Sequence, residues 1–144
     1  MNKKTFIFLA LAFSLAHAAQ GQLANISTRG HVGKDQQVLI AGFILDQPAT
    51  VIIRGLGPSL ETSGVTDTLA NPVLALYDMT GATPQLLWSN DDWQDVTEPF
   101  GALAPAFPKE SAIYIQLPAG KYTAILGGIS GTEGMALVEV YLIQ

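Results

Sequence analysis

A short acidic segment carries the side chains in this sequence that are best suited to chemistry. Asp91 and Asp92 stand next to each other, and Asp95 comes three residues later. Carboxylate oxygens gathered in one loop are the hard ligands that Ca²⁺ requires, and a complete site needs about 6–8 oxygens. The spacing is not that of an EF-hand. Asp91, Asp92 and Asp95 are therefore candidate Ca²⁺ ligands, and a solvated acidic turn is the alternative.

Two tryptophans flank these carboxylates. Trp88 precedes the acidic segment and Trp93 lies within it. An exposed indole can stack on a sugar ring or on a partner protein, whereas a buried indole would only close one end of a core. Trp88 and Trp93 are thus candidate ligand contacts, with core packing as the alternative.

The sequence contains no convincing catalytic set. It has no Cys and two His, of which His17 belongs to a leader-like segment, so His31 would have to serve as any imidazole base. Its serines lack the framing glycines of a nucleophile elbow. Adjacent Asp91 and Asp92 would point to opposite sides of an extended chain, which disfavours a glycosidase pair. We predict a protein that is not an enzyme, with a hydrolase as the least favoured class.

A glycine-rich segment at residues 54–60 has the sequence RGLGPSL. It lacks the third glycine or the lysine of a phosphate-binding loop, and no helix is predicted to follow it. A strand that ends in a Gly-Pro turn explains the segment better. Arg54 just before the turn is predicted to form a structural ion pair.

The N-terminus has the three parts of a secretory signal. Lys3 and Lys4 form a basic start, residues 5–15 are almost continuously apolar, and Ala16-His17-Ala18 is a small-x-small cleavage site. The apolar run is too short to span a bilayer, which takes about 20 residues. We predict a signal peptide over residues 1–18, cleavage near Ala18, and one secreted domain over 19–144, in the periplasm or outside the cell.

Charge and composition narrow the classes of partner. The formal net charge is −5, which argues against nucleic acid and against an anionic membrane surface. The absence of Cys excludes a disulfide scaffold and thiolate metal sites. No later segment is long and apolar enough to span a membrane. The expected partner is a protein or a glycan at the cell surface.

Short apolar runs separated by Gly and Pro predict an all-β chain, a two-layer β-sandwich or jelly roll of about eight antiparallel strands. In the last run, Val138, Val140 and Leu142 share a face and Glu139 lies on the other, so the first face is the expected core side. The residues Pro118-Ala119-Gly120 are expected to close a tight hairpin. Residues 90–110 form the longest connection, which is functional or flexible in most compact domains. The expected strands cover residues 23–29, 37–45, 50–56, 73–78, 86–89, 111–117, 121–127 and 136–143.

Several motifs occur in a characteristic order along the chain. They are NISTRG at 25–30, RGLGPSL at 54–60, NDDW at 90–93, GKYTAI at 120–125 and ALVEVY at 136–141. This series resembles an uncharacterised segment that recurs in large secreted proteins of environmental Gram-negative bacteria. That family has no assigned activity.

The second half is also similar to the bacterial pre-peptidase C-terminal domain. The shared features are a Leu-Tyr-Asp strand end at 76–78, a glycine turn, the Asn-Asp-Asp loop, and a Leu-x-x-Gly-x-Tyr pattern that ends at Tyr122. This resemblance implies a β-sandwich that serves secreted proteins as an accessory module for targeting or substrate binding, and some members hold calcium. No catalytic domain stands beside it here, which weakens the accessory role.

Together these patterns favour a secreted, non-enzymatic binding or structural module, Ca²⁺-stabilised through the acidic loop, that binds through residues 90–110. Two alternatives come from other classes. The apolar C-terminal strand could offer a free edge for self-assembly into a homo-oligomer or a surface filament. Trp88 or Trp93 could instead make the protein a carbohydrate-binding module.

Overall fold

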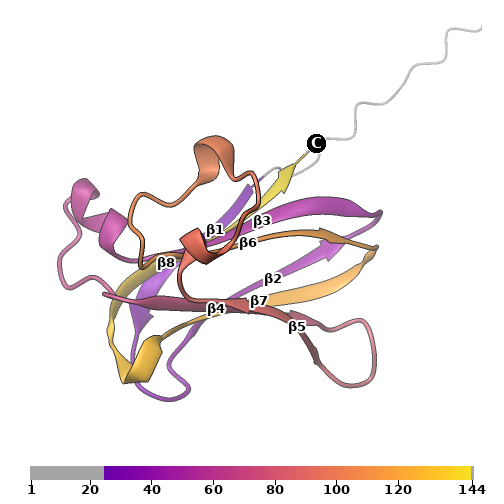
Figure 1. The fold of residues 1–144 in the computed structure, drawn as a ribbon. Helices are drawn as coiled ribbons and strands as arrows, with labels where there is room; N and C mark the ends of the chain where they lie inside the picture. Colours follow the sequence, from indigo (N-terminus) through magenta and orange to yellow (C-terminus); the bar gives the residue numbers. More distant parts are fainter. Residues whose placement is uncertain (1–24, 144) are drawn as a thin grey trace, which may run out of the picture.

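The computed structural model describes residues 25–143, and these residues form eight antiparallel strands in two stacked sheets (Figure 1). Sheet A has the strand order β1-β8-β3-β6, and sheet B has the order β2-β7-β4-β5. The all-β sandwich predicted from the sequence is confirmed. The predicted signal peptide and the two ends of the predicted domain 19–144 lie outside the described residues. The strands are β1 (Asn25–Val32), β2 (Leu39–Leu45), β3 (Ala49–Leu56), β4 (Pro72–Asp78), β5 (Gln85–Asn90), β6 (Ser111–Leu117), β7 (Gly120–Gly128) and β8 (Gly134–Ile143).

The core lies between the sheets and follows the predicted alternation. Val138 and Val140 of β8 are buried, while Glu139 between them lies on the outer face of sheet A. On β7, Tyr122, Ala124 and Leu126 are buried against the same core. Because successive side chains of a strand point to opposite faces, one apolar face per strand is enough to fill a two-layer sandwich.

The connections between strands differ from the sequence-based expectation at one turn. Among the described strands, β4 and β5 are the only chain neighbours that pair in one sheet, and the other connections cross from sheet to sheet. The prediction that residues 118–120 close a hairpin is therefore wrong. β6 pairs with β3, and β7 pairs with β2 and β4. The turn is an arch between layers, and the Tyr122 hydroxyl donates to the Pro118 carbonyl at 2.9 Å across it.

The C-terminal strand β8 is not an edge strand, contrary to the expectation from the sequence. β8 lies inside sheet A, with β1 on one side and β3 on the other, so its backbone groups are already paired. It cannot offer the free edge on which the self-assembly alternative was based. The edges of the described sheets are β1 and β6 in sheet A and β2 and β5 in sheet B. β5 and β6 lie on the same side of the sandwich and contact each other.

The connection from β5 to β6, residues 91–110, folds onto the outer face of sheet A (Figure 1). A second apolar cluster forms there, in which Phe100 of the connection meets Ile52 of β3 and Ala112 of β6. The segment is thus a packed cover of one sheet face. Its two helical turns are η2 (Trp93–Asp95) and η3 (Gly101–Leu103), and the other 3-10 turns are η1 (Pro58–Ser63) and η4 (Ile129–Gly131). Among residues 25–143, no helix has the length and apolar character needed to cross a membrane.

Candidate functional site

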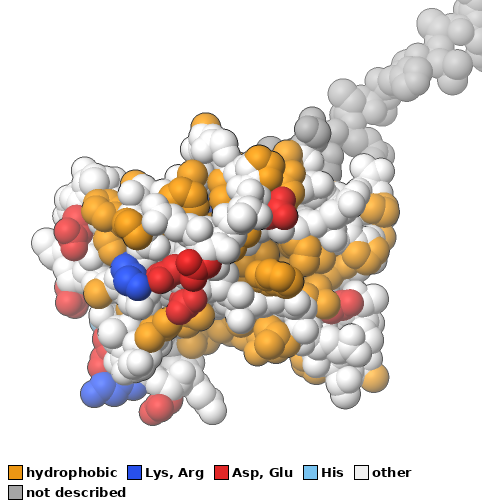
Figure 2. Space-filling model, viewed as in Figure 1, with side chains coloured by type: hydrophobic (Ala, Val, Ile, Leu, Met, Phe, Trp, Pro, Cys, Tyr) orange, Lys and Arg blue, Asp and Glu red, His pale blue; other side chains and the backbone are white. Residues whose placement is uncertain are grey.

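A lysine side chain, Lys109, forms an ion pair within the acidic loop. The Lys109 ammonium lies 2.9 Å from Oδ2 of Asp92. The hydrogen bond and the charge of Asp92 raise the pKa of Lys109, and the charges of Asp91 and Asp95 raise it further. Figure 2 shows a group of carboxylates with a basic side chain at its border and hydrophobic side chains beyond it. The three predicted ligands therefore share one neighbourhood, in which a lysine already supplies positive charge.

This arrangement does not make a calcium ligand set. Within residues 25–143, no three carboxylate or imidazole side chains lie close enough together to hold a metal ion. Asp92 has one unused oxygen, because its Oδ1 is buried without a hydrogen-bond partner among the described residues. Its Oδ2 is engaged by Lys109. Since Ca²⁺ takes about 6–8 oxygen ligands, the side chains present in this loop do not fit it.

Trp93 is used inside the loop. Its indole Nε1–H donates to the Phe107 carbonyl at 3.0 Å, and its ring meets Phe100 edge to face at a centroid distance of 6.0 Å. Phe100 in turn meets Tyr114 of β6 edge to face at 6.2 Å. Trp93 therefore acts as a packing group of the second cluster, and this placement does not favour it as a ligand contact.

Glu110 is a buried carboxylate that sequence reasoning missed. Its side chain is fully buried, and Oε1 accepts from the backbone N–H groups of Gly57 at 3.1 Å and Ser59 at 2.8 Å. Oε2 accepts from the Ser59 hydroxyl at 2.5 Å and the Phe107 N–H at 3.3 Å. One side chain thus ties the turn after β3 to the end of the 91–110 connection. The signal in the sequence that could have drawn attention to it is its place directly before the predicted strand 111–117.

The turn that Glu110 binds depends on close backbone approach. A Cβ on Gly57 would lie 1.9 Å from the Leu69 carbonyl oxygen, so only glycine fits there. Pro58 follows at the start of η1, where its missing N–H costs nothing. The sequence-based interpretation of a strand that ends in a Gly-Pro turn is confirmed.

Arg54 of β3 also contacts the 91–110 connection, near its middle. Its guanidinium forms an ion pair with Glu139 of β8, and both side chains are largely buried. Nη1 donates to the Leu103 carbonyl at 3.2 Å, and the guanidinium carbon lies 5.2 Å from the centre of the Tyr141 ring. Burial is the main cause that raises the pKa of the Tyr141 hydroxyl. The predicted structural ion pair of Arg54 is therefore present.

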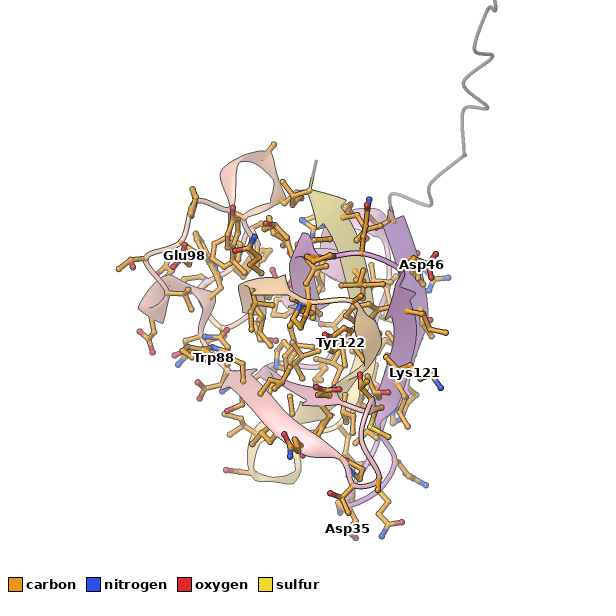
Figure 3. All side chains as sticks on the ribbon, turned by 90° about the vertical axis from the view of Figure 1, so that its right-hand side faces the viewer. Asp35, Asp46, Trp88, Glu98, Lys121 and Tyr122 are labelled. Carbon is orange, nitrogen blue, oxygen red and sulfur yellow. The ribbon has the colours of Figure 1, made fainter. Side chains whose placement is uncertain are left out.

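A groove of about 330 Å³ lies where the edges of the two sheets meet. Trp88 of β5 forms one wall and remains 53% exposed, although aromatic rings are mostly buried in folded proteins. Figure 3 shows Trp88 and Glu98 on the same side of the molecule, with Glu98 beyond the end of β5. The lining side chains are Trp88, Val96, Glu98, Tyr114, Ile115 and Gln116. This groove brings Trp88, a predicted contact residue, together with the polar groups of Glu98, Tyr114 and Gln116.

The structure separates the remaining candidates from this groove. Asp91, Asp92 and Asp95 do not line it, and neither does Trp93. His31, the residue that would have to serve as any imidazole base, lies exposed on β1, paired with Met135 of β8. Tyr114 and Gln116 were not foreseen, because the sequence does not reveal that β6 is an edge strand.

Comparison with known proteins identifies the fold. No protein-family model matches the chain, and no curated protein matches it. Among solved structures, it is similar to the pre-peptidase C-terminal domain of a collagenase from Bacillus anthracis. The TM-score is 0.52 at 11% sequence identity, and the match covers 81% of this chain and 89% of that domain. The architecture is that of a pre-peptidase C-terminal β-sandwich, as the sequence resemblance implied.

Proposed function

We propose that this chain is a secreted, non-enzymatic binding module whose groove between β5 and β6 holds a ligand at the cell surface or outside the cell. The observation that carries the proposal is the exposed indole of Trp88 in a concave site. Leaving a large aromatic ring half in water forfeits burial free energy, and such rings are common where a partner covers them. The signal-like N-terminus supports secretion.

The composition of the groove supports binding rather than catalysis. Val96, Ile115 and Tyr114 provide apolar and aromatic walls, and Glu98 and Gln116 provide polar groups. A ligand site of this kind gains affinity from the apolar contacts and orientation from a few polar ones. None of these lining residues is paired as nucleophile and base.

Two ligand classes suit an exposed indole beside polar groups. A sugar ring can stack on Trp88 while its hydroxyls bond to Glu98 and Gln116, which keeps the carbohydrate-binding alternative. A protein segment can place an apolar side chain on the same ring. Both classes use Trp88, so one variant tests the groove for either.

The test is binding of the purified mature protein to a glycan array and to a synthetic peptide array. We expect Trp88→Ala to abolish binding, because tryptophan has the largest side chain among the lining residues. The matched control is Leu86→Ala, since Leu86 lies on the same strand, is 56% exposed and does not line the groove. Binding that survives Trp88→Ala, or that is lost equally in the control, would contradict the proposal.

Self-assembly has its own support at a different surface. Ile40 and Ile44 on the edge strand β2 are 58% and 68% exposed. Exposed apolar side chains along a sheet edge favour association with another chain. Size-exclusion chromatography with light scattering tests this alternative: it requires an oligomer that Ile44→Lys dissociates, and a monomer at high concentration would eliminate it.

A further inference from the structure

The free edge of β6 presents unpaired backbone groups. The N–H of Ala112 donates to Oδ1 of Asn90 at 2.8 Å, so this N–H points away from β3. In an antiparallel pair the backbone groups of alternate residues point to alternate sides. The N–H and C=O groups of Tyr114 and Gln116 therefore also point away from β3. No strand within residues 25–143 pairs with this edge.

The same two residues line the groove. Tyr114 and Gln116 line it together with Trp88, so the residues that carry the unpaired backbone groups and the exposed indole belong to the same groove. Residues two apart in a strand lie about 6.8 Å from each other. An extended peptide repeats its own donors and acceptors at that spacing, whereas a sugar has no such ladder.

The charge around the groove is of one sign. Glu98 is the only charged side chain among the lining residues, and the whole chain has a formal net charge of −5. A cationic side chain on the ligand would be attracted to this carboxylate. A ligand carrying Lys or Arg is thus favoured over an acidic one.

We propose that the groove binds an extended, basic peptide segment that adds to sheet A as a fifth strand beside β6. Its backbone bonds with the N–H and C=O groups of Tyr114 and Gln116, an apolar side chain packs on Trp88, and a Lys or Arg side chain pairs with Glu98. This is strand addition, in which the backbone supplies affinity and the side-chain pockets supply specificity. The inference rests on the proposed function of the groove and names its ligand class.

The backbone component can be tested by removing one N–H. Gln116→Pro deletes the donor on the free edge, and the β3–β6 ladder is kept because that N–H points away from β3. Gln116→Ala is the control that removes the side chain and keeps the donor. The probe is an array of octapeptides with β-branched residues at alternate positions and Lys, Glu or Ser at a central position.

We expect the Lys-containing octapeptides to bind best, and we expect Gln116→Pro to weaken them about tenfold or more, since a lost hydrogen bond of about 1.4 kcal/mol is a factor of ten in affinity. Gln116→Ala should change binding much less, and Trp88→Ala should abolish it. The best octapeptide is also made with single N-methyl groups along its backbone. We expect N-methylation to weaken binding of the octapeptide at alternate positions only. This measurement tests the backbone hydrogen bonds between the peptide and β6 even if Gln116→Pro does not fold.

The outcomes separate this inference from the proposed function. A glycan that binds in a Trp88-dependent manner, with no octapeptide bound, would overturn the inference and leave the groove's binding role intact. Octapeptides that bind equally well to Gln116→Pro and with every N-methyl group would also overturn it. A dimer that Gln116→Pro dissociates, without peptide binding, would replace the peptide by a second copy of the chain. Absence of any Trp88-dependent ligand would overturn both proposals.

Discussion

Replacing Glu110 by glutamine tests whether one buried carboxylate joins the turn after β3 to the 91–110 connection. The carboxylate accepts four hydrogen bonds from Gly57, Ser59 and Phe107, at 2.5 to 3.3 Å. Hydrogen bonds to a charged group contribute about 1.5–3 kcal/mol each. In Glu110→Gln one oxygen becomes an NH₂ group, which faces the Phe107 N–H as donor against donor. The Ser59 hydroxyl can rotate and accept instead.

The net expectation for Glu110→Gln is the loss of one charge-assisted bond and a weakening of the others. We expect the free energy of unfolding to fall by about 2–3 kcal/mol. Glu110→Ala leaves the buried Gly57 N–H without an acceptor and should cost about 4 kcal/mol or more. The assay is urea denaturation followed by tryptophan fluorescence, in which the midpoint should fall and the slope should stay constant.

The matched control is Glu98→Gln, since Glu98 is an exposed carboxylate in the same connection. Its free energy of unfolding should stay within about 0.5 kcal/mol of the wild-type value. Amide exchange adds a local measurement: the Ser59 and Phe107 amides should lose protection in Glu110→Gln. A Glu110→Gln protein as stable as Glu98→Gln would refute the role assigned to this carboxylate.

Three further predictions concern charged groups. Hydrogen bonds from the Thr80 side chain and from its backbone N–H, the latter at 2.7 Å, lower the pKa of Asp78. The stabilisation that ionised Asp78 provides is therefore complete at neutral pH and is lost as the pH falls through the pKa of Asp78 in the folded protein. In an NMR titration, Thr80→Ala should raise that pKa towards its ordinary value, and an unchanged pKa would contradict the cause. Lys109→Met frees an oxygen of Asp92, but too few carboxylates lie close together to complete a Ca²⁺ site, so millimolar Ca²⁺ should leave the melting temperatures of the variant and the wild type unchanged, and a rise in either would restore the calcium prediction. Arg54→Met leaves its largely buried carboxylate partner uncompensated and should lower the free energy of unfolding by about 3 kcal/mol in urea denaturation, whereas a loss below about 1 kcal/mol would mean that water replaces the guanidinium.

Prediction from the sequence succeeded where the signal is local. Alternation along a strand is decided by neighbouring residues, so the core face of β8, with Val138 and Val140 inside and Glu139 outside, could be deduced without a structure. Turns marked by Gly and Pro bounded the strands to within a few residues for the same reason. The resemblance to a pre-peptidase C-terminal domain extended this to the correct architecture.

Prediction failed where the answer depends on contacts between distant residues. Residues 118–120 can turn the chain within a sheet or between sheets with the same local geometry, and packing of the apolar faces selected the arch. The acidic loop showed three carboxylates, but its lysine partner, Lys109, comes 17 residues after Asp92 and meets it only in the folded chain. The buried position of Glu110 likewise depends on a turn more than 50 residues away.

The sequence by itself determined that this chain forms short amphipathic strands, where they begin and end, and which of their faces are apolar, because each of these properties depends on residues next to one another. Only the tertiary structure decided which strands pair, and therefore which edges stay free. β8, which the sequence made the candidate edge, is enclosed by β1 and β3, while β6 and Trp88 are left at the open side. A strand becomes an edge only through the neighbours it lacks, and that property is not encoded in its own residues.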